Sequence, residues 1–505
     1  MATTNHYDLI VIGSDIAGLV AASLTARRGK RVLVIPHGPA DGTYRLARET
    51  FSLNEAPLIH LGCPALHRVY DELGLWTQIS RERRTLSDIV HWILPEQRMD
   101  LQPGMLNWSQ EAERAWPDDP VREAWELRHR WAHACDELLD EVLASEGVLT
   151  ADGFWGRRFL NRVAEQLPAT TLDELEPLRS DHPLRAGARA LEPWYLHLSP
   201  SQLGKAASLR ISELWSRGPE DRTGGESALR QQLLQRIQLK SGDVKPNLRV
   251  GEILLKRGKV TGIALLGKKD RYGCDQMLIA SDPQGLVSGQ LLPEPIPKAL
   301  ALSLSGLKRV AHRFVMHLEI APEGLSPALG GISICVPLAD ARGPHGEGLT
   351  YLRRGEPTPH GHQRISVTRI VGAHDSIASA REQLLQELDE RGILPFVHDH
   401  LAFVHSPHDG REASDGRGSL VDRYGTATAL RLPMTALYET EIPPTLGVGV
   451  LPHFSGIKNL YLASQLTYPG LGLEGEFAAG WAAAGVIAST SRPGLGRNLF
   501  LGRGR

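Results

Sequence analysis

The chain has 505 residues, of which 42% are hydrophobic and 23% are charged. This is an ordinary composition for a globular protein with room for more than one domain. The formal net charge of −2 gives no electrostatic basis for binding nucleic acid or an anionic membrane. The four cysteines, Cys63, Cys135, Cys274 and Cys335, are far apart and form no C-x-x-C pair, so we expect reduced thiols and no metal or redox pair.

The N-terminus leads directly into an apolar segment. No basic region and no long hydrophobic run come before it, so no signal peptide is predicted. No window holds about 18 uninterrupted apolar residues, and a transmembrane helix is therefore not expected. The expectation is a cytoplasmic protein, with peripheral membrane contact left open.

The residues from Tyr7 to Pro36 predict a strand, a tight turn, a helix and a second strand. Residues 9–12 form a continuous apolar run, as in a strand that is buried on both faces of a parallel sheet. Apolar residues at helical spacing follow from 16 to 24, and Gly29 stands where the helix should end. This βαβ pattern is typical of dinucleotide-binding folds, whose first turn presents a helix N-terminus to a phosphate.

The first turn departs from the G-x-G-x-x-G fingerprint of dinucleotide binding. Gly13 and Gly18 occupy the outer positions, but Asp15 replaces the middle glycine, and its carboxylate would meet a phosphate with like charge. Pro36 stands where an acidic residue would accept hydrogen bonds from the ribose hydroxyls. The pattern therefore predicts the dinucleotide-binding fold and leaves open whether a dinucleotide is bound.

Residues 42–176 predict a polar loop, strand-like pieces and long helices. Arg45 and Arg48 lie in a loop that either runs beside a cofactor pyrophosphate or is a solvated surface connection. Residues 80–101 indicate short strands. Tryptophans recur at helical spacing over residues 111–176, as expected of a packed core. A helical insertion after a nucleotide-binding start is a common place for a substrate cap.

The central part of the chain predicts further helices and strands. Residues 183–217 indicate a helix, and the Gly-Gly pair at 224–225 begins another that runs to about residue 239. Residues 247–266 predict a hairpin, and residues 276–283 a short buried strand that ends in a turn. Four more strands predict a second, mixed sheet, over residues 308–320, 331–338, 349–353 and 364–371. A helix with one solvated, charged face follows over 375–391.

Four histidines, His398, His400, His405 and His408, lie close together in sequence and invite a metal interpretation. Their spacing of i, i+2, i+7 and i+10 fits no helical ligand pair. A polar loop is therefore the favoured interpretation, and no metal is predicted.

The last block of the chain repeats the organisation of the first. Residues 459–463 predict a buried strand, 464–475 a glycine-rich turn and 476–488 a helix of small residues. A glycine-rich turn that leads into a helix N-terminus again suits an anionic ligand. The tail from residue 491 is rich in glycine and arginine and is predicted to be flexible.

Together these motifs resemble the phytoene desaturase-like branch of the flavin amine oxidase superfamily, which includes carotenoid desaturases and isomerases and retinol saturase-like proteins. The resemblance rests on the βαβ start, the G-G-x-x-A-L helix near 225, the A-S-D-P strand end near 280 and the terminal N-L-Y-L-A-x-x-x-T-x-P-G-x-G-x-x-G segment. The terminal segment is its most specific part. The resemblance covers nearly the whole chain, from about Tyr7 to Ala488.

The resemblance implies an α/β fold with a Rossmann-like FAD/NAD(P)-binding domain, a second mixed-sheet substrate domain and a helical insertion. It implies that FAD lies against the following residues: Gly13, Ser14, Asp15, Ala17, Gly18, Pro36, Arg45, Val250, Ser464, Gln465, Gly470, Gly472 and Gly475. In that arrangement Gly13 and Gly18 shape the pyrophosphate turn, and Val250 or a neighbour lies on the adenine side. The family's Gly-Asp pair before the terminal threonine is Ser464-Gln465 here, so an amide replaces a carboxylate near the ribityl chain.

The predicted organisation divides the chain into six segments. They are the dinucleotide-binding domain in three parts (1–75, 221–290 and 451–490), a helical substrate or cap region (76–220), the mixed-sheet substrate domain (291–450) and the flexible tail (491–505). The first and last thirds of the chain must then fold together around one cleft.

Two functions agree with these patterns. The first is an FAD-dependent oxidoreductase of the phytoene desaturase type, acting on a long apolar polyene or lipid-like substrate, in which the cofactor carries the redox chemistry. No catalytic residue is identified for it. The second is a catalytically inactive relative that has lost tight FAD binding and serves as a lipid-binding or protein-interaction module. The resemblance favours the enzyme, whereas the departures at Asp15, Pro36 and Gln465 favour the second function. A third option is that the same cleft binds a different nucleotide.

Overall fold

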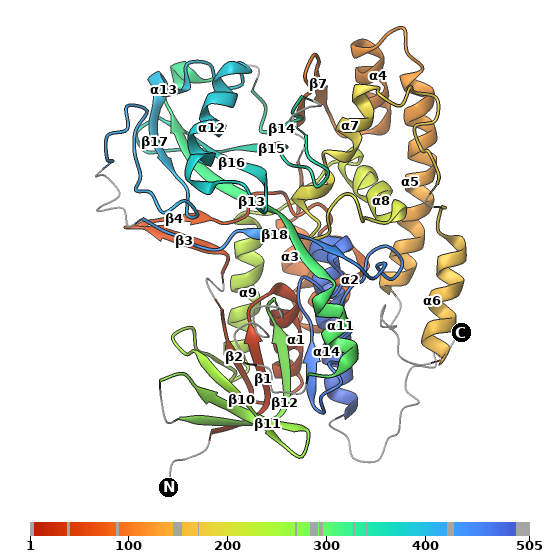
Figure 1. The fold of residues 1–505 in the computed structure, drawn as a ribbon, viewed down its shortest axis with the longest axis vertical. Helices are drawn as coiled ribbons and strands as arrows, with labels where there is room; N and C mark the ends of the chain where they lie inside the picture. Colours follow the sequence, from red (N-terminus) through yellow and green to blue (C-terminus); the bar gives the residue numbers. More distant parts are fainter. Residues whose placement is uncertain are drawn as a thin grey trace.

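The computed structural model describes residues 5–37, 41–86, 90–144, 154–169, 171–267, 270–282, 291, 296–326, 329–338, 342–421 and 429–490. Two sheets lie one above the other along the long axis, with a group of helices beside the upper one (Figure 1). The predicted tail from residue 491 lies outside the described residues.

The first sheet has seven strands in the order β10-β11-β12-β1-β2-β9, and β19 also pairs with β12. Its strands are β1 (Asn5–Gly13), β2 (Val32–Ile35), β9 (Asp243–Val244), β10 (Val250–Lys256), β11 (Lys259–Leu265), β12 (Arg271–Ala280) and β19 (Leu460–Leu462). Strands β12, β1, β2 and β9 run parallel, and the β10–β11 hairpin adds an antiparallel edge. The apolar runs at 9–12 and 32–35 are fully buried because this sheet is covered on both faces.

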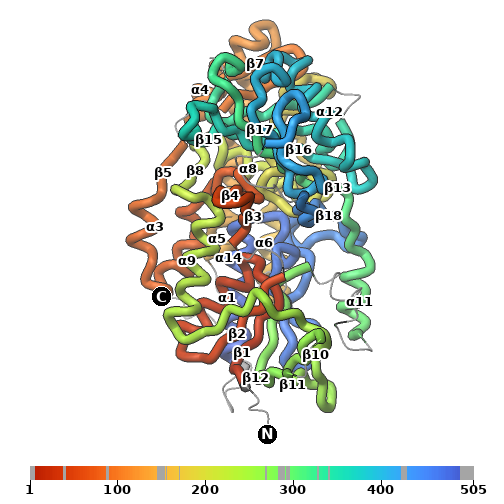
Figure 2. The backbone as a smooth tube through the Cα atoms, turned by 90° about the vertical axis from the view of Figure 1, so that its left-hand side faces the viewer, coloured from red at the N-terminus to blue at the C-terminus, as the bar shows by residue number. Residues whose placement is uncertain are grey.

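Four helices pack against the first sheet and its turns: α1 (Ile16–Arg27), α2 (Pro64–Glu72), α9 (Gly225–Leu239) and α14 (Gly472–Thr490). Helices α1 and α14 lie side by side, as Figures 1 and 2 both show. A Cβ atom at Gly480 would stand 2.4 Å from the carbonyl oxygen of Ala17 and 2.6 Å from Cβ of Val20. The small residues of α14 are therefore required by its close approach to α1.

The second sheet has eight strands in the order β17-β13-β16-β15-β14-β6-β7, and β18 also pairs with β13. The strands are β6 (Val90–Ile93), β7 (Arg98–Leu101), β13 (Leu307–Ile320), β14 (Ile332–Cys335), β15 (Thr350–Pro357), β16 (Gln363–Gly372), β17 (Leu401–His405) and β18 (Thr435–Thr440). The four predicted strands of a mixed sheet are confirmed as β13 to β16. The pairing of β6 with β14 is parallel and the other pairings are antiparallel.

The helical insertion consists of α4 (Met105–Ala115), α5 (Val121–Ala144), α6 (Phe154–Gln166), α7 (Pro183–Arg189) and α8 (Lys205–Ser216). Its tryptophans form a core as predicted: Trp108 lies 5.4 Å, between ring centroids, from both Trp92 and Trp125. Trp131 of α5 is an exception, since its side chain is 37% exposed. The insertion and the second sheet therefore share one apolar cluster.

Short elements connect these layers. They are the hairpin β3 (Thr43–Leu46) and β4 (Glu49–Ser52), the pair β5 (Arg84–Thr85) and β8 (Glu220–Asp221), and the helices α3 (Trp76–Glu82), α11 (Lys298–Ser305), α12 (Ile377–Glu390) and α13 (Val397–His400), with the 3-10 turns η1 (Glu192–Trp194), η2 (Pro322–Gly324) and η5 (Pro469–Leu471). No helix in the described ranges is long and apolar enough to cross a membrane.

Two predicted boundaries are wrong in ways that affect the site. The helix predicted over 183–217 is interrupted between α7 and α8, where Pro193 and Pro200 lack the N–H group that a helix interior needs. The helix predicted from residue 476 begins at Gly472 instead, so its first turn includes part of the predicted glycine-rich loop. The interruption at 190–204 supplies cavity-lining residues that a continuous helix would not present.

A buried arginine ties the insertion to α14. The guanidinium of Arg210 on α8 is 1% exposed and donates hydrogen bonds to Asp136 and Asp140 of α5, the latter over 2.6 Å. It also donates to Glu474 in the first turn of α14 over 3.0 Å. Arg210 and Glu474 stabilise each other's charges, which lowers the pKa of Glu474 to about 2 despite its burial.

We predict opposite effects for two glycine substitutions in α14. Gly480→Ala is expected to destabilise the protein by roughly 1–3 kcal/mol, because the added methyl group overlaps the backbone of α1. Gly485→Ala, on the same helix, has no neighbouring atom within 4 Å of its added Cβ and is expected to stabilise the protein by roughly 0.5–1 kcal/mol. Urea unfolding of both variants measures the two changes. Equal effects would contradict the close α1–α14 contact.

Candidate functional site

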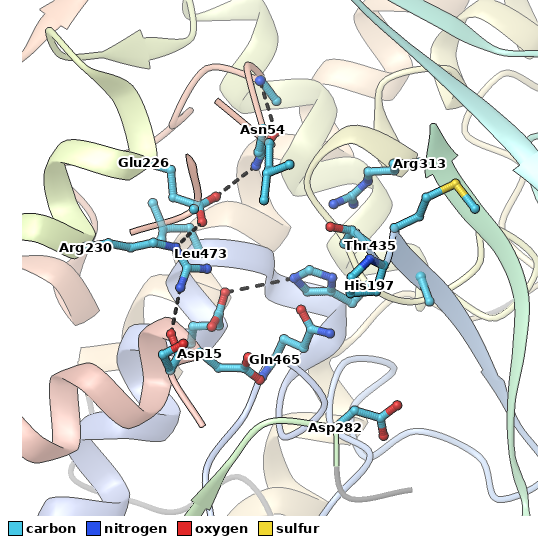
Figure 3. A pocket seen from close by; sticks show the side chains of 18 of the residues that line it. Asp15, Asn54, His197, Glu226, Arg230, Asp282, Arg313, Thr435, Gln465 and Leu473 are labelled. Atoms are coloured by element: carbon cyan, nitrogen blue, oxygen red, sulfur yellow. Dashed lines mark hydrogen bonds and ion pairs between the residues drawn. The ribbon is translucent and has the colours of Figure 1, made fainter. Parts of the chain in front are cut away.

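A cavity of about 640 Å³ lies between the two sheets, at the end of the insertion. The first turn, the loop at 52–58, the segment at 194–197 and helix α9 form part of its wall, and β13, β18 and the last glycine-rich turn form the rest. Charged and polar side chains share this lining with apolar ones, and Figure 3 shows several of the charged groups.

The cavity brings together the first and last thirds of the chain. The carboxylate of Asp15 accepts a hydrogen bond from the backbone N–H of Gln465 over 3.1 Å. The backbone N–H of Ala17, in the first turn of α1, donates to the carboxyl of Glu476 over 3.3 Å. The two glycine-rich turns therefore face each other across one cleft, as the sequence predicts.

Three of the predicted site residues, Ser14, Asp15 and Gln465, line the cavity. The glycines of the first turn have another role. A Cβ at Gly13 would stand 2.2 Å from the carbonyl oxygen of Ala280, and one at Gly18 would stand 2.0 Å from Cβ of the same residue. Gly13 also has a φ of +105°, which only glycine adopts readily. These two glycines are thus required by the approach of β12 to the turn.

The glycines of the last turn are likewise placed against protein atoms. A Cβ at Gly472 would stand 2.4 Å from the carbonyl oxygen of Tyr195, and one at Gly475 would stand 2.3 Å from that of Tyr468. For Gly470 the nearest atom is Cα of Val448, at 2.7 Å. The glycine pattern of this segment is therefore accounted for by close packing of the chain.

The remaining predicted residues lie around the cavity wall. Pro36 and Val250 are buried in or beside the first sheet, and Arg45 is exposed on β3. Ser464 is buried, and its hydroxyl accepts a hydrogen bond from the backbone N–H of Leu466. None of these four side chains contributes to the lining of the cavity. Their assignment to FAD stays a prediction.

Two carboxyl groups lie at the N-terminus of α1. Desolvation raises the pKa of Asp15 to about 6, although the Gln465 N–H and the charge of Arg230 oppose the increase. Desolvation and the charge of Asp15 together raise the pKa of Glu476 to about 8. At neutral pH Asp15 is therefore ionised while Glu476 keeps its proton.

Arg230 of α9 is the positive charge of this region, and sequence analysis missed it. Its Nη1 donates to the carbonyl oxygen of Ser14 over 2.7 Å, and its Nε donates to Glu226 over 2.7 Å. The other carboxylate oxygen of Glu226 accepts from the side-chain amide of Asn54 over 2.8 Å. The signal was present in the sequence, since Arg230 stands one turn after the Gly-Gly pair that opens α9.

Four further lining residues were also missed: Tyr195, His197, Arg309 and Arg313. The first two belong to the interruption between α7 and α8, where a continuous helix was predicted. The two arginines belong to β13, whose sequence predicts a strand without indicating what its side chains face. Arg309 forms an ion pair with Asp282 at the end of β12.

The histidines that invited a metal interpretation lie apart from this cavity. His405 Nδ1 forms a hydrogen bond with the hydroxyl of Tyr44 over 3.2 Å, and His408 Nδ1 forms one with the carbonyl oxygen of Leu432 over 2.9 Å. Within the part of the chain that the structure describes, no group of three potential ligands is placed to hold a metal ion.

An FAD pyrophosphate fits the N-terminus of α1 in one protonation state only. The first-turn N–H groups of a helix are the usual phosphate donors, and one of them, that of Ala17, is bonded to Glu476. With Asp15 ionised, a phosphate would meet like charge in a desolvated site. With both carboxyls protonated, the pair is neutral and each group can donate a hydrogen bond to a phosphate oxygen.

Comparison with known proteins establishes the fold. No family model matches the chain, and no curated protein matches its sequence. Solved structures with this fold include an oxidoreductase from Methanosarcina mazei, with 14% sequence identity, a TM-score of 0.54 and a match over 96% of this chain and 100% of that one. A putrescine oxidase variant is also similar, with 14% identity, a TM-score of 0.57 and a match over 96% of this chain and 100% of that one. A third is a cyclohexylamine oxidase from Brevibacterium oxydans IH-35A, with 14% identity, a TM-score of 0.55 and a match over 96% of this chain and 99% of that one.

The chain has the fold of the FAD-dependent oxidoreductases, with a Rossmann-like domain and a substrate-binding domain. The predicted fold class is therefore confirmed. The similarity covers nearly the full length of this chain and of each of these three structures, so it includes both sheets and the insertion. At 14% identity the similarity shows the fold alone.

We predict that the contribution of Asp15 and Glu476 to protein stability falls as pH rises from about 4 to about 8. Carboxyls in the unfolded chain ionise near pH 4, whereas Asp15 and Glu476 stay protonated to about pH 6 and 8 when folded. At these two groups the folded state thus binds more protons over this interval, and each unit of raised pKa lowers stability by about 1.4 kcal/mol, against an opposite contribution from buried histidines such as His317 and His453. Glu476→Gln should flatten the fall, because an amide does not titrate in this pH range. The variant should still fold, because the amide oxygen can accept the hydrogen bond from the Ala17 N–H.

Urea unfolding at several pH values measures this slope. The matched control is Glu123→Gln, which changes an exposed glutamate of α5 and should leave the slope as in the parent protein. An unchanged slope in Glu476→Gln would mean that Glu476 is already ionised at low pH.

Proposed function

We propose that this protein is an FAD-dependent oxidoreductase that holds its flavin weakly and acts on a small polar substrate. The observation that carries the proposal is the cavity bounded by both glycine-rich turns, in a chain that shares the flavin oxidoreductase fold over 96% of its length. Cofactor and substrate would share this cavity. When bound, the flavin would supply hydride or electron exchange.

The residues of the chain would bind and orient this cofactor. The N-terminus of α1 would receive the pyrophosphate, with the guanidinium of Arg230 fixed beside it through its bond to the Ser14 carbonyl. His37 lines the cavity just beyond the end of β2, on the side where an adenosine would lie. The replacement of the ribose-binding acid by Pro36 removes one contact and lowers the expected affinity further.

The charges of the cavity favour a polar substrate. Glu226, Asp282, Arg309 and Arg313 line it together with several histidines. Glu226, Asp282 and Arg309 are paired within the protein, but Arg313 has no carboxylate partner among the described residues, and a long polyene would offer it no hydrogen-bond partner. The narrower prediction of a phytoene desaturase type with an apolar substrate stays a prediction, and the two solved amine oxidases of the same fold act on polar molecules by their names.

A second candidate function is favoured by one specific contact. The hydrogen bond from Ala17 N–H to Glu476 occupies the donor that a phosphate would use, so the protein supplies its own group at this position. A relative that has lost FAD altogether, and that serves as a lipid-binding or protein-interaction module, would keep such a contact permanently.

We predict that FAD binding strengthens as pH falls. A pyrophosphate at the α1 N-terminus favours the protonated form of Asp15, so binding takes up a proton above about pH 6. Affinity should therefore be at least about tenfold higher at pH 6 than at pH 8. The double variant Asp15→Asn with Glu476→Gln should bind FAD at pH 8 as tightly as at pH 6.

Titration calorimetry in two buffers of different ionisation enthalpy measures both affinity and proton uptake. Glu123→Gln is the control and should keep the pH dependence of the parent. If neither the parent nor the double variant binds FAD at any pH, the oxidoreductase proposal fails and the second candidate is favoured. Tight binding that does not change with pH would show that the carboxyl pair does not face the phosphates.

A further inference from the structure

A buried arginine in the cavity wall has no carboxylate partner. Arg313 of β13 is 6% exposed, and its Nε and Nη2 donate to the carbonyl oxygens of Pro193 and Leu196 over 2.7 and 2.6 Å. Within the described part of the chain, no carboxylate lies within 4.0 Å of its guanidinium, and its Nη1 forms no hydrogen bond. Buried arginines are normally paired, so an unpaired one that lines a cavity is unusual.

The charge of Arg313 persists at neutral pH. Desolvation lowers its pKa to about 10, and the nearest acid, Glu226, acts on it only from a distance. That glutamate is already bonded to Arg230 and Asn54. The positive charge of Arg313 is therefore available to a molecule in the cavity.

Two polar atoms of other residues that line the cavity also have no partner. The hydroxyl of Tyr195 and Nδ1 of His197 are buried, and neither forms a hydrogen bond with any described residue. Buried polar atoms are almost always hydrogen-bonded, and exceptions call for an explanation. Both residues line the cavity. After desolvation, the charge of Arg313 is the main influence on the pKa of His197, whereas Tyr351, Asp221 and Arg353 act on the pKa of Tyr195 more strongly than Arg313 does.

His197 is suited to meet an anion as a neutral donor. Desolvation, together with the charges of Arg313 and Arg230, holds the pKa of its imidazole well below the usual value. The other ring nitrogen, Nε2, stands 4.0 Å from the carboxyl of Glu476, and a dashed line in Figure 3 marks this contact. A neutral imidazole carries one N–H, which Nδ1 can direct at an acceptor in the cavity.

The three groups are held in place by one another. Arg313 bonds the carbonyl oxygens of residues 193 and 196, on either side of Tyr195 and directly before His197. The backbone N–H of His197 in turn donates to the carbonyl oxygen of Pro469 over 2.9 Å. Figure 3 shows Arg313, Thr435 and His197 along one wall of the cavity. The donors are thus fixed before any ligand arrives.

We propose that Arg313, Tyr195 and His197 form a subsite for the carboxylate of a small-molecule ligand. A carboxylate would accept from Nη1 of the arginine, from the tyrosine hydroxyl and from the imidazole N–H, which satisfies all three groups at once. Trp194 and Tyr438 line the same cavity and give an apolar surface for the body of the ligand. The inference deepens the proposed function by naming carboxylates as the substrate class. It rests on that function only for the assumption that the substrate binds in this cavity.

The test uses benzoate and acetate as carboxylate probes and benzamide as the neutral counterpart of benzoate. Calorimetric titration of the full-length protein without added flavin should show benzoate binding at least about tenfold more tightly than benzamide, since a charge-assisted bond is lost in the amide. Arg313→Met should abolish the preference for benzoate over benzamide. Tyr195→Phe should weaken benzoate binding several-fold.

A matched variant separates ligand binding from folding. Tyr195→Phe removes a hydroxyl without a hydrogen-bond partner, so its stability should equal or exceed that of the parent protein. The hydroxyl of Tyr70 on α2 is also buried without a hydrogen-bond partner among the described residues, but it lies outside the cavity. Tyr70→Phe should therefore leave benzoate binding unchanged. This comparison keeps the test valid even if Arg313→Met fails to fold.

Phosphate is the other oxyanion that could use these donors, and ADP is the probe for it. If Arg313→Met weakens ADP and leaves benzoate unaffected, the subsite belongs to a phosphate and the carboxylate proposal is overturned. It is also overturned if neither carboxylate binds, or if benzoate and benzamide bind equally. Benzoate binding without any FAD binding at any pH would instead contradict the proposed function and leave the subsite intact.

Discussion

The structure depends on the contact of the N-terminus of α1 with the last glycine-rich turn and the start of α14. Two hydrogen bonds make it: Gln465 N–H to Asp15, and Ala17 N–H to Glu476. Together they join residues that are more than four hundred positions apart, and they close the cleft at the point where relatives of this fold class are expected to hold a phosphate. The close packing of α1 on α14 at Gly480 sets the distance over which these bonds form.

The charges around this contact are arranged in pairs, with one exception. Arg230 is paired with Glu226, and Arg309 is paired with Asp282. Asp15 and Glu476 are satisfied by backbone N–H groups, and the proton that Glu476 keeps at neutral pH limits the negative charge at the helix N-terminus. Arg313 alone faces the cavity without an acid in the described structure. The cavity wall therefore holds both proton-sensitive acids, Asp15 and Glu476, and a cation, Arg313, that no acid among the described residues neutralises.

The sequence allowed the fold to be predicted because its signals are local. Buried parallel strands appear as apolar runs, and the turns that precede α1 and α14 contain glycines that no other residue can replace. The sequence could not show what these glycines make room for. A backbone that approaches a cofactor and a backbone that approaches Ala280 or Tyr195 both require glycine. Arg313 and Tyr195 lie more than a hundred positions apart, and no periodicity relates a strand residue to a loop residue. The pairing of Glu476 with Ala17 was hidden for the same reason.

The ion cluster at Arg210 has a mechanical consequence for the whole molecule. Arg210 bonds α5 and α14 at once, and its partner Glu474 stands two residues before Glu476 in the same helical turn. Removal of Arg210 would leave the buried carboxylates of Asp136 and Glu474 without this partner, at a cost of roughly 3–5 kcal/mol. The insertion and the last helix are therefore fixed to each other two residues away from Glu476, the carboxyl that contacts α1.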